Sequence, residues 1–434
     1  MKFPAHSVWS QVARWLMLAA AAATVAVVAA APARAQTNAG WVGGAAPIAN
    51  DYNNGANWSP AGVPTGTATF GASSVTSIDI NASTSVDGWT FNAGTYQFNL
   101  GHLDHFAFNN AGIVVNGGSV SINVAPAAEL TFQNASTAGD ASINISFGGG
   151  QVTFQGSSTA GNALIINNQL VLFGGTSTGG NAAITNNGNG IIDFSQSAGP
   201  GGLQQVSAGS ISGPGGLFLG NNQLTVGGNG RDTAVSGAIA DGGTGGGIGG
   251  SLVKVGGGTM ILSGVNSYSG NTTVQGGTLQ VDSLILSPLT TVANNGTLAG
   301  NGFIGGVVQV NSGGKLAPGG ATGIVLTAGG LTFRPGAHYN IGLTPSAATS
   351  TNVSFTAMLG GATVVANFAS GNYGTTNKQY TILTAGNISG TFVTQIQNNN
   401  LPANFTDSLS YDSNHVFLNL FLNFSLPNSG LNQN

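Results

Sequence analysis

The sequence predicts an all-β fold, a parallel β-helix (β-solenoid) with about 20 residues per coil. Past the first residues, short apolar alternations are separated by Gly, Asn and Ser, as in strands bounded by turns. The 434 residues include 72 glycines, and only 5% are charged, but 41% are hydrophobic. This apolar content argues against a disordered chain and favours a folded one with many turns.

An internal repeat sets the predicted coil length. Residues 136–141 recur at 158–163 and at 177–182, with spacings of 22 and 19 residues. A repeat near 20 residues is too short for a propeller blade of about 40–45. It fits one coil, and roughly 400 residues then predict about 20 coils and a rod on the order of 90–100 Å long.

A phenylalanine stands before each copy of the repeat and predicts how the core is filled. Stacked coils place equivalent residues about 4.8 Å apart, so we expect these rings to form an internal aromatic stack. The series comprises Phe132, Phe154, Phe173 and Phe194.

Residues 1–35 are predicted to be a secretory signal. Lys2 and Arg14 both precede an alanine-rich apolar run. After this run, Ala33-Arg34-Ala35 has the small-x-small pattern of a cleavage site. We expect cleavage after Ala35, so that Gln36 begins the exported chain. The alternative is a retained membrane anchor, because the apolar run is nearly long enough to span a bilayer.

The remaining chain divides by composition into three regions. Residues 36–125 hold three of the five Trp and are predicted to form an N-terminal cap and the first coils, since a solenoid end must be covered. Residues 126–345 are the predicted body, and residues 346–434 the C-terminal coils and a linker.

Charge and cysteine content exclude several classes of function. Three of the eight Lys and Arg lie in the predicted signal, leaving five against twelve Asp and Glu, with none between Arg34 and Arg231. Nucleic acids and anionic lipids require a basic surface, so neither is an expected partner. The absence of Cys means that no disulfide supports the fold.

Residues 249–281 closely resemble the autotransporter-associated β-strand repeat of passenger domains. The matching features are Leu252-Val253-Lys254, Leu262-Ser263-Gly264, Asn266-Ser267-Tyr268-Ser269-Gly270 and Gly277-Thr278-Leu279. The resemblance implies a right-handed, single-stranded β-helix, export to the cell surface, outer membrane or medium, and a structural or adhesive role.

The same resemblance bears on how the chain is exported. Residues 346–434 are similar to the autochaperone-like end of such passengers, whose stable coils would template folding after export. The family carries a C-terminal outer-membrane barrel, which these 434 residues do not contain; a linker into it would begin near Asn434. We therefore expect either a truncated autotransporter or a passenger that exists alone. Export would then depend on that barrel or on other outer-membrane machinery.

Two short segments were weighed as metal sites. His102, Asp104 and His105 offer transition-metal ligands, although their spacing matches no established motif. Residues 227–235 fit the calcium-binding nonapeptide at the glycines and Asp232, but Ala234 occupies the core-anchor position and the motif occurs once. Surface polar residues and a turn are the favoured interpretations, so no metal or cofactor is expected.

The acidic side chains do not pair up within the repeat as catalysis would require. A glycosidase needs paired carboxylates, but neither Glu129 nor Asp193 aligns with an acidic neighbour one coil away. Asp140 aligns with Asn162 and Asn181, which predicts a ladder of turn residues. There is no G-x-S-x-G segment for a serine hydrolase, and His338 and His415 fall in the predicted terminal coils.

The resulting prediction is a monomeric, non-enzymatic surface protein. Its expected partners are surface glycans or host and cell-surface ligands, through exposed Thr, Asn and aromatic side chains. A polysaccharide-active hydrolase or lyase on the same scaffold is the alternative, because many solenoids of this shape have such activity.

Overall fold

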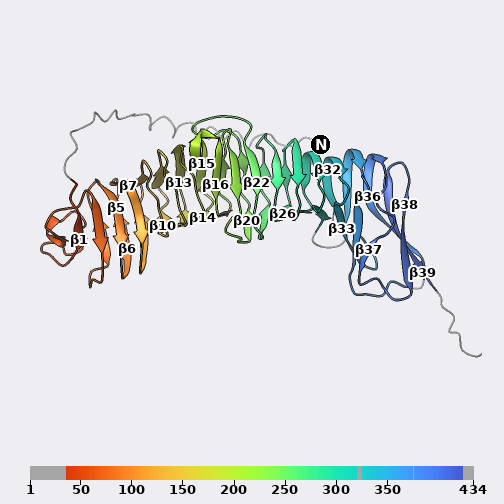
Figure 1. Ribbon diagram of the computed structural model, residues 1–434, viewed down its shortest axis with the longest axis horizontal. Coiled ribbons are helices and arrows are strands. Elements are labelled where there is room, and N and C mark those ends of the chain that lie inside the picture. Colours follow the sequence, from red (N-terminus) through yellow and green to blue (C-terminus); the bar gives the residue numbers. More distant parts are fainter. Residues whose placement is uncertain (1–35, 320–324, 375, 424–434) are drawn as a thin grey trace, which may run out of the picture.

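A computed structural model describes residues 36–319, 325–374 and 376–423. The predicted signal and its cleavage site at Ala33, Ala35 and Gln36 therefore lie almost wholly outside the described residues. The chain is 53% strand and 2% helix, and its parallel coils form a β-solenoid of about 14 turns. Figure 1 shows this solenoid as a rod whose coils follow the sequence from one end to the other. The predicted fold class is confirmed.

The strands belong to four sheets, and two short 3-10 helices, η2 (Gly55–Asn57) and η3 (Pro200–Gly202), lie in loops. The 11-stranded sheet contains, in spatial order, β2 (Trp58–Ser59), β1 (Ala39–Trp41), β3 (Thr67–Phe70), β5 (Thr84–Phe91), β7 (His105–Val115), β9 (Glu129–Phe132), β11 (Gln151–Phe154), β13 (Leu170–Gly175), β15 (Ile191–Ser197), β18 (Gly216–Phe218) and β21 (Ile239–Ala240). The 7-stranded sheet contains β17 (Ser210–Ser212), β14 (Ala183–Asn186), β12 (Leu164–Asn167), β10 (Ser142–Ile145), β8 (Ser119–Val124), β6 (Thr95–Leu100) and β4 (Ser77–Ile80).

The other two sheets form the C-terminal half. The 13-stranded sheet contains β16 (Gln205–Ala208), β19 (Gln223–Val226), β22 (Ser251–Lys254), β25 (Thr272–Val274), β28 (Leu289–Val292), β30 (Phe303–Val310), β32 (Val325–Phe333), β34 (Ser350–Met358), β36 (Lys378–Ser389), β39 (His415–Leu422) and β38 (Phe405–Tyr411), with β24 (Val265–Asn266) and β27 (Leu284–Ile285) beside this path. The 8-stranded sheet contains β20 (Thr233–Val235), β23 (Thr259–Leu262), β26 (Gly277–Val281), β29 (Gly296–Gly300), β31 (Lys315–Pro318), β33 (His338–Leu343), β35 (Thr363–Phe368) and β37 (Gln397–Asn399).

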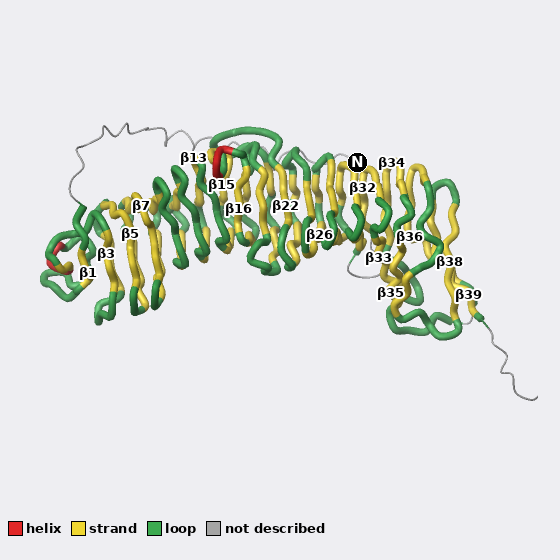
Figure 2. The backbone as a smooth tube through the Cα atoms, viewed as in Figure 1, coloured by secondary structure: helices red, strands yellow, loops and turns green. Residues whose placement is uncertain are grey.

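The four sheets join into continuous faces along the rod. A bridge between Gly213 and Val235 links the 7-stranded sheet to the 8-stranded one. Strand β21 ends the 11-stranded sheet beside β24, where the N–H of Ser267 donates to the carbonyl of Ile239 at 2.9 Å. Strand β24 then pairs with β27, and β27 with β30. Figure 2 shows the resulting rows of strands, with loops at the corners between them.

The predicted aromatic stack fills the core of the N-terminal half. The rings of Phe132, Phe154, Phe173 and Phe194 lie 4.9, 4.9 and 4.4 Å apart and nearly parallel, and all four side chains are fully buried. Phe108 extends the series by one coil, with its ring 5.0 Å from that of Phe132. The spacing follows from the distance between hydrogen-bonded strands.

The repeated turns stack as the sequence alignment predicts. Gly161 has φ +60°, and a Cβ atom added there would meet the carbonyl oxygen of Gly139 at 2.9 Å. This turn therefore requires glycine both for its backbone conformation and for the space between coils. Beside it, the amide of Asn162 donates to Asp140 at 3.0 Å and that of Asn181 to Asn162 at 3.1 Å. Asp140 is thus one rung of a turn ladder, as predicted.

The number of coils differs from the prediction. The structure has about 14 turns roughly 22 residues apart, against the predicted 20 coils. Long corner insertions, such as residues 241–250, lengthen individual turns. The last strands also leave the solenoid pattern, since β39 pairs antiparallel with both β36 and β38.

The N-terminal end is closed by an aromatic cluster. Strands β1 and β2 pair antiparallel, and the rings of Trp41 and Trp58 lie 5.0 Å apart. The indole N–H of Trp58 donates to the carbonyl of Tyr52 at 2.8 Å, inside the core. These contacts cover the first coil and shield its edge. None of the described helices is long and apolar enough to span a membrane.

Candidate functional site

The residues weighed as a transition-metal site point to separate partners. Nδ1 of His102 lies 2.7 Å from the carbonyl oxygen of Pro126. Nδ1 of His105 lies 2.9 Å from Oε2 of Glu129, which follows it by one coil, and the hydroxyl of Thr153 donates to the other oxygen of Glu129. In the described ranges, no three His, Cys, Asp or Glu side chains converge on one point.

The calcium-like nonapeptide forms a corner and a strand. The carboxylate of Asp232 accepts the N–H of Thr259, in the following coil, at 2.6 Å. Ala234 faces solvent, and Val235 takes the buried position. Asp232 therefore links one coil to the next by a hydrogen bond, so its carboxylate has a structural role.

The histidines considered for a hydrolase lie on different strands of the C-terminal region. His338 on β33 stands in register between Lys315 and Thr363. Nδ1 of His415 lies 3.0 Å from both carboxylate oxygens of Asp412. Hydrogen bonds from the Asn414 N–H and from the His415 side chain lower the pKa of Asp412. This pair closes the hairpin between β38 and β39.

Asp193 is buried and anchors a loop, a role that the sequence analysis did not predict. Its side chain is only 1% exposed. Oδ1 accepts the N–H of Ser195 at 2.8 Å, and Oδ2 accepts both the N–H and the hydroxyl of Thr244 at 2.8 Å. Thr244 belongs to residues 241–250, a glycine-rich corner insertion. Asp241 closes the base of this insertion by accepting the N–H of Gly250 and the hydroxyl of Ser269.

We expect Asp193→Ala to release the loop at residues 241–250. Loss of three hydrogen bonds to a carboxylate should favour local opening by at least about tenfold. Limited proteolysis with subtilisin, followed by mass spectrometry, should find faster cleavage in this loop. Asp140→Ala, on the exposed turn ladder, is the matched control. Equal cleavage of both variants would contradict an anchoring role for Asp193.

Residues 252–281 span one complete coil and two strands of the next, from β22 to β26. Within them Lys254 occupies an inward position, in register with the buried Val226 and Val274. Its Nζ donates to the carbonyls of Val255 at 2.8 Å, Gly256 at 3.3 Å and Gly276 at 3.3 Å. The ammonium thus fastens two successive turns. Burial lowers the pKa of Lys254, an effect that the charge of Asp232 partly opposes.

A second buried polar residue of this segment, Asn266, connects neighbouring coils. Nδ2 of Asn266 donates to the carbonyls of Gly264 at 2.8 Å and Leu284 at 3.1 Å, and Oδ1 accepts the N–H of Ile239 at 3.2 Å. The hydroxyls of Tyr268 and Thr272 lie 2.6 Å apart in the core. Asn266 therefore joins three consecutive coils.

The lowered pKa of Lys254 predicts a specific pH dependence of stability. The unfolded lysine, with a pKa of about 10.4, binds more protons than the folded one in the window just below that pH. The free energy of unfolding should therefore gain a contribution from Lys254 as the pH rises through this window. Urea unfolding at pH 7 and pH 10 should show a larger gain for the unaltered chain than for Lys254→Met. Lys315→Met, at an exposed site, controls for loss of a positive charge, and identical gains in all three would refute the prediction.

Comparison with known proteins finds a match for this segment. The passenger-associated-transport-repeat family matches residues 252–281. The chain is 37% identical over 116 residues to the adhesin BmaC autotransporter of Brucella suis biovar 1 (strain 1330), covering 26% of this chain and 3% of the adhesin. It is also 37% identical over 92 residues to an extracellular serine protease of Serratia marcescens, covering 21% of this chain and 9% of that protein. The matched regions are thus a small part of either relative.

Proposed function

Because residues 252–281 are a passenger-associated transport repeat within a parallel β-solenoid, we propose that the chain is an exported passenger with a structural or adhesive role. The repeat is the observation that carries this proposal, since its buried polar residues fasten coil to coil. The adhesin relative supports display at the cell surface, although the chain covers only a small part of it. A rod built of stacked coils holds its far end away from its point of attachment, as display requires.

The hydrogen bonds that several acidic side chains make within the solenoid support a role without catalysis. Asp193 and Asp241 anchor a loop, Asp232 joins two coils, and Asp140 belongs to a turn ladder. Glu129 accepts hydrogen bonds from a neighbouring coil. A glycosidase would instead need two carboxylates that flank one bond of the substrate. The expected ligands are therefore glycans or proteins of an opposing surface, bound by uncharged side chains.

Labelling of intact bacteria tests this proposal. An antibody raised against residues 36–434 should label unpermeabilised cells or detect the chain in the medium, and Edman sequencing of that chain should begin at Gln36. A deletion strain should adhere less to host cells or to abiotic surfaces, and the intact gene should restore adhesion. Protein found only in permeabilised cells, or unchanged adhesion by the deletion strain, would refute display or adhesion respectively.

A further inference from the structure

The first and last coils of the solenoid are covered in different ways. Aromatic rings close the N-terminal end, whereas β38 is the last strand of the 13-stranded sheet at the other end (Figure 1). Within the described part of the chain, β38 pairs with β39 alone. An unpaired edge presents a row of N–H and C=O groups that can add a further strand.

The hydrogen bonds show which groups of β38 point outward. The N–H of Asn423 donates to the carbonyl of Asn404 at 2.7 Å, and that of Asp412 donates to His415 at 3.1 Å. In an antiparallel ladder, alternate residues bond to the partner strand. Even-numbered residues of β38 therefore face β39, and the N–H groups of Asp407, Leu409 and Tyr411 face away from it.

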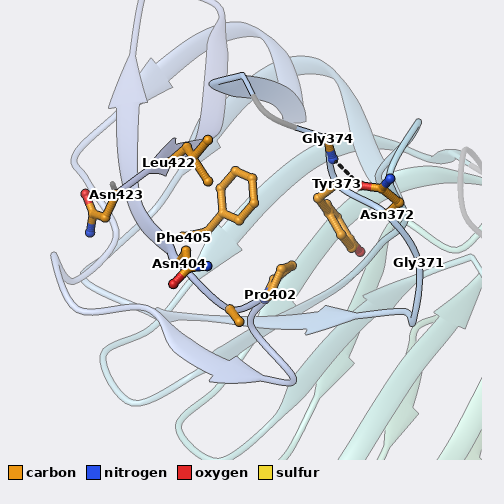
Figure 3. Close-up of a pocket in the computed structure, with 10 residues that line it drawn as sticks. Gly371, Asn372, Tyr373, Gly374, Pro402, Asn404, Phe405, Leu422 and Asn423 are labelled. Carbon is orange, nitrogen blue, oxygen red and sulfur yellow. Dashed lines mark hydrogen bonds between the residues drawn. The ribbon is translucent and has the colours of Figure 1, made fainter. Parts of the chain in front are cut away.

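A pocket opens at the first residue of this strand. It has a volume of about 460 Å³, within the range of small-ligand sites. Figure 3 shows Phe405, Leu422, Pro402 and Tyr373 around the space, with Asn404 among the polar residues at its margin. Its lining residues carry no formal charge and offer both polar and apolar groups, so the pocket suits an uncharged side chain.

The inner face of β38 is also incompletely covered. Leu409 and Tyr411 pack against the core but are only half-buried. Between them and Phe405, Oδ2 of Asp407 is buried and has no hydrogen-bond partner among the described residues. Burial raises the pKa of Asp407.

We propose that this end of the solenoid binds an extended, uncharged peptide segment of another polypeptide. The segment pairs with β38 through backbone hydrogen bonds and places one large uncharged side chain in the pocket beside Phe405. Main-chain pairing supplies affinity and the pocket supplies specificity, as in other cases of strand addition. This partner site goes beyond the proposed display function, which stands whether or not the peptide binds.

The test uses the purified chain and a fluorescein-labelled peptide of eight residues, in which Thr alternates with Val and one Phe. Fluorescence anisotropy should show saturable binding. The same peptide N-methylated at alternate amides, which cannot pair with an edge strand, should bind at least about tenfold more weakly. This comparison requires no change in the protein.

Two pairs of measurements locate the binding on β38. Leu409→Pro removes an outward N–H and should weaken binding at least about tenfold, whereas Leu409→Ala, which keeps it, should weaken binding less. Ala403→Trp fills the pocket and should also reduce affinity about tenfold or more. Thermal unfolding checks that each variant is folded. Absence of saturable binding to the unaltered chain, or equal affinity for the two peptides, would overturn the proposal.

Discussion

Phe154→Ala is expected to lower the free energy of unfolding by about 3–5 kcal/mol. Phe154 is fully buried, and its ring lies 4.9 Å from both Phe132 and Phe173. The substitution removes two aromatic contacts and leaves a cavity that neighbouring coils cannot fill, because their hydrogen bonds fix the spacing. Urea unfolding followed by circular dichroism measures the change.

Phe147→Ala is the matched control for this substitution. Phe147 is 66% exposed and lies in a turn close in sequence, so its removal should change the free energy of unfolding by no more than about 0.5 kcal/mol. A loss below about 1 kcal/mol for Phe154→Ala would contradict the stacked core. Each coil contacts only its neighbours, so the loss should be greatest near β11, as hydrogen exchange would show.

The aromatic stack and the turn ladder could be predicted because both obey the repeat. A solenoid places residues one coil apart in register, so aligning residues 136–141 with 158–163 also aligns their positions in space. Phe132 over Phe154 and Asp140 beside Asn162 follow directly from that alignment. The same alignment accounts for the scarcity of charged residues. A charged residue repeated at one outward position would lie next to a like charge in the neighbouring coil, and the two would repel each other.

The loop anchored by Asp193 could not be predicted, because it interrupts the repeat. Its partner Thr244 lies 51 residues away in an insertion with no equivalent in other coils. In the structure Asp193 stands in register with Leu172, which pairs with Thr153 one coil earlier. Burial of the carboxylate comes from the insertion folding back over it. The segment from Asp241 to Gly250 offered only one clue, its glycine content.

The pocket and the position of β38 at the edge of its sheet could not be predicted from the sequence either. They depend on the change from parallel coils to an antiparallel hairpin, which the β-helix prediction did not contain. Nothing in the alternation of residues 405–411 distinguishes an edge strand from an inner one. The coil count was too high for a related reason, since a constant coil length allows for neither insertions nor a hairpin.

Asn266→Ala is expected to lower the free energy of unfolding by about 3 kcal/mol. The substitution leaves the N–H of Ile239 and the carbonyls of Gly264 and Leu284 without their partner in a fully buried site. Each unsatisfied group carries a desolvation penalty of about 1–3 kcal/mol, part of which water recovers if the coils separate slightly. Asn162→Ala removes an exposed ladder amide and should change stability by less than about 1 kcal/mol.

Asn266→Asp separates hydrogen bonding from packing at the same site. The carboxylate can still accept the N–H of Ile239, but it loses both donated hydrogen bonds and places a charge in a fully buried site. Burial raises the pKa of such a carboxyl, so the folded state binds more protons than the unfolded state. The variant should therefore become more stable as the pH falls from 7 to 5, whereas Asn266→Ala should follow the unaltered chain. If the two variants responded alike to pH, a carboxyl at position 266 would titrate as it does in the unfolded chain, which would contradict a buried side chain between the three coils.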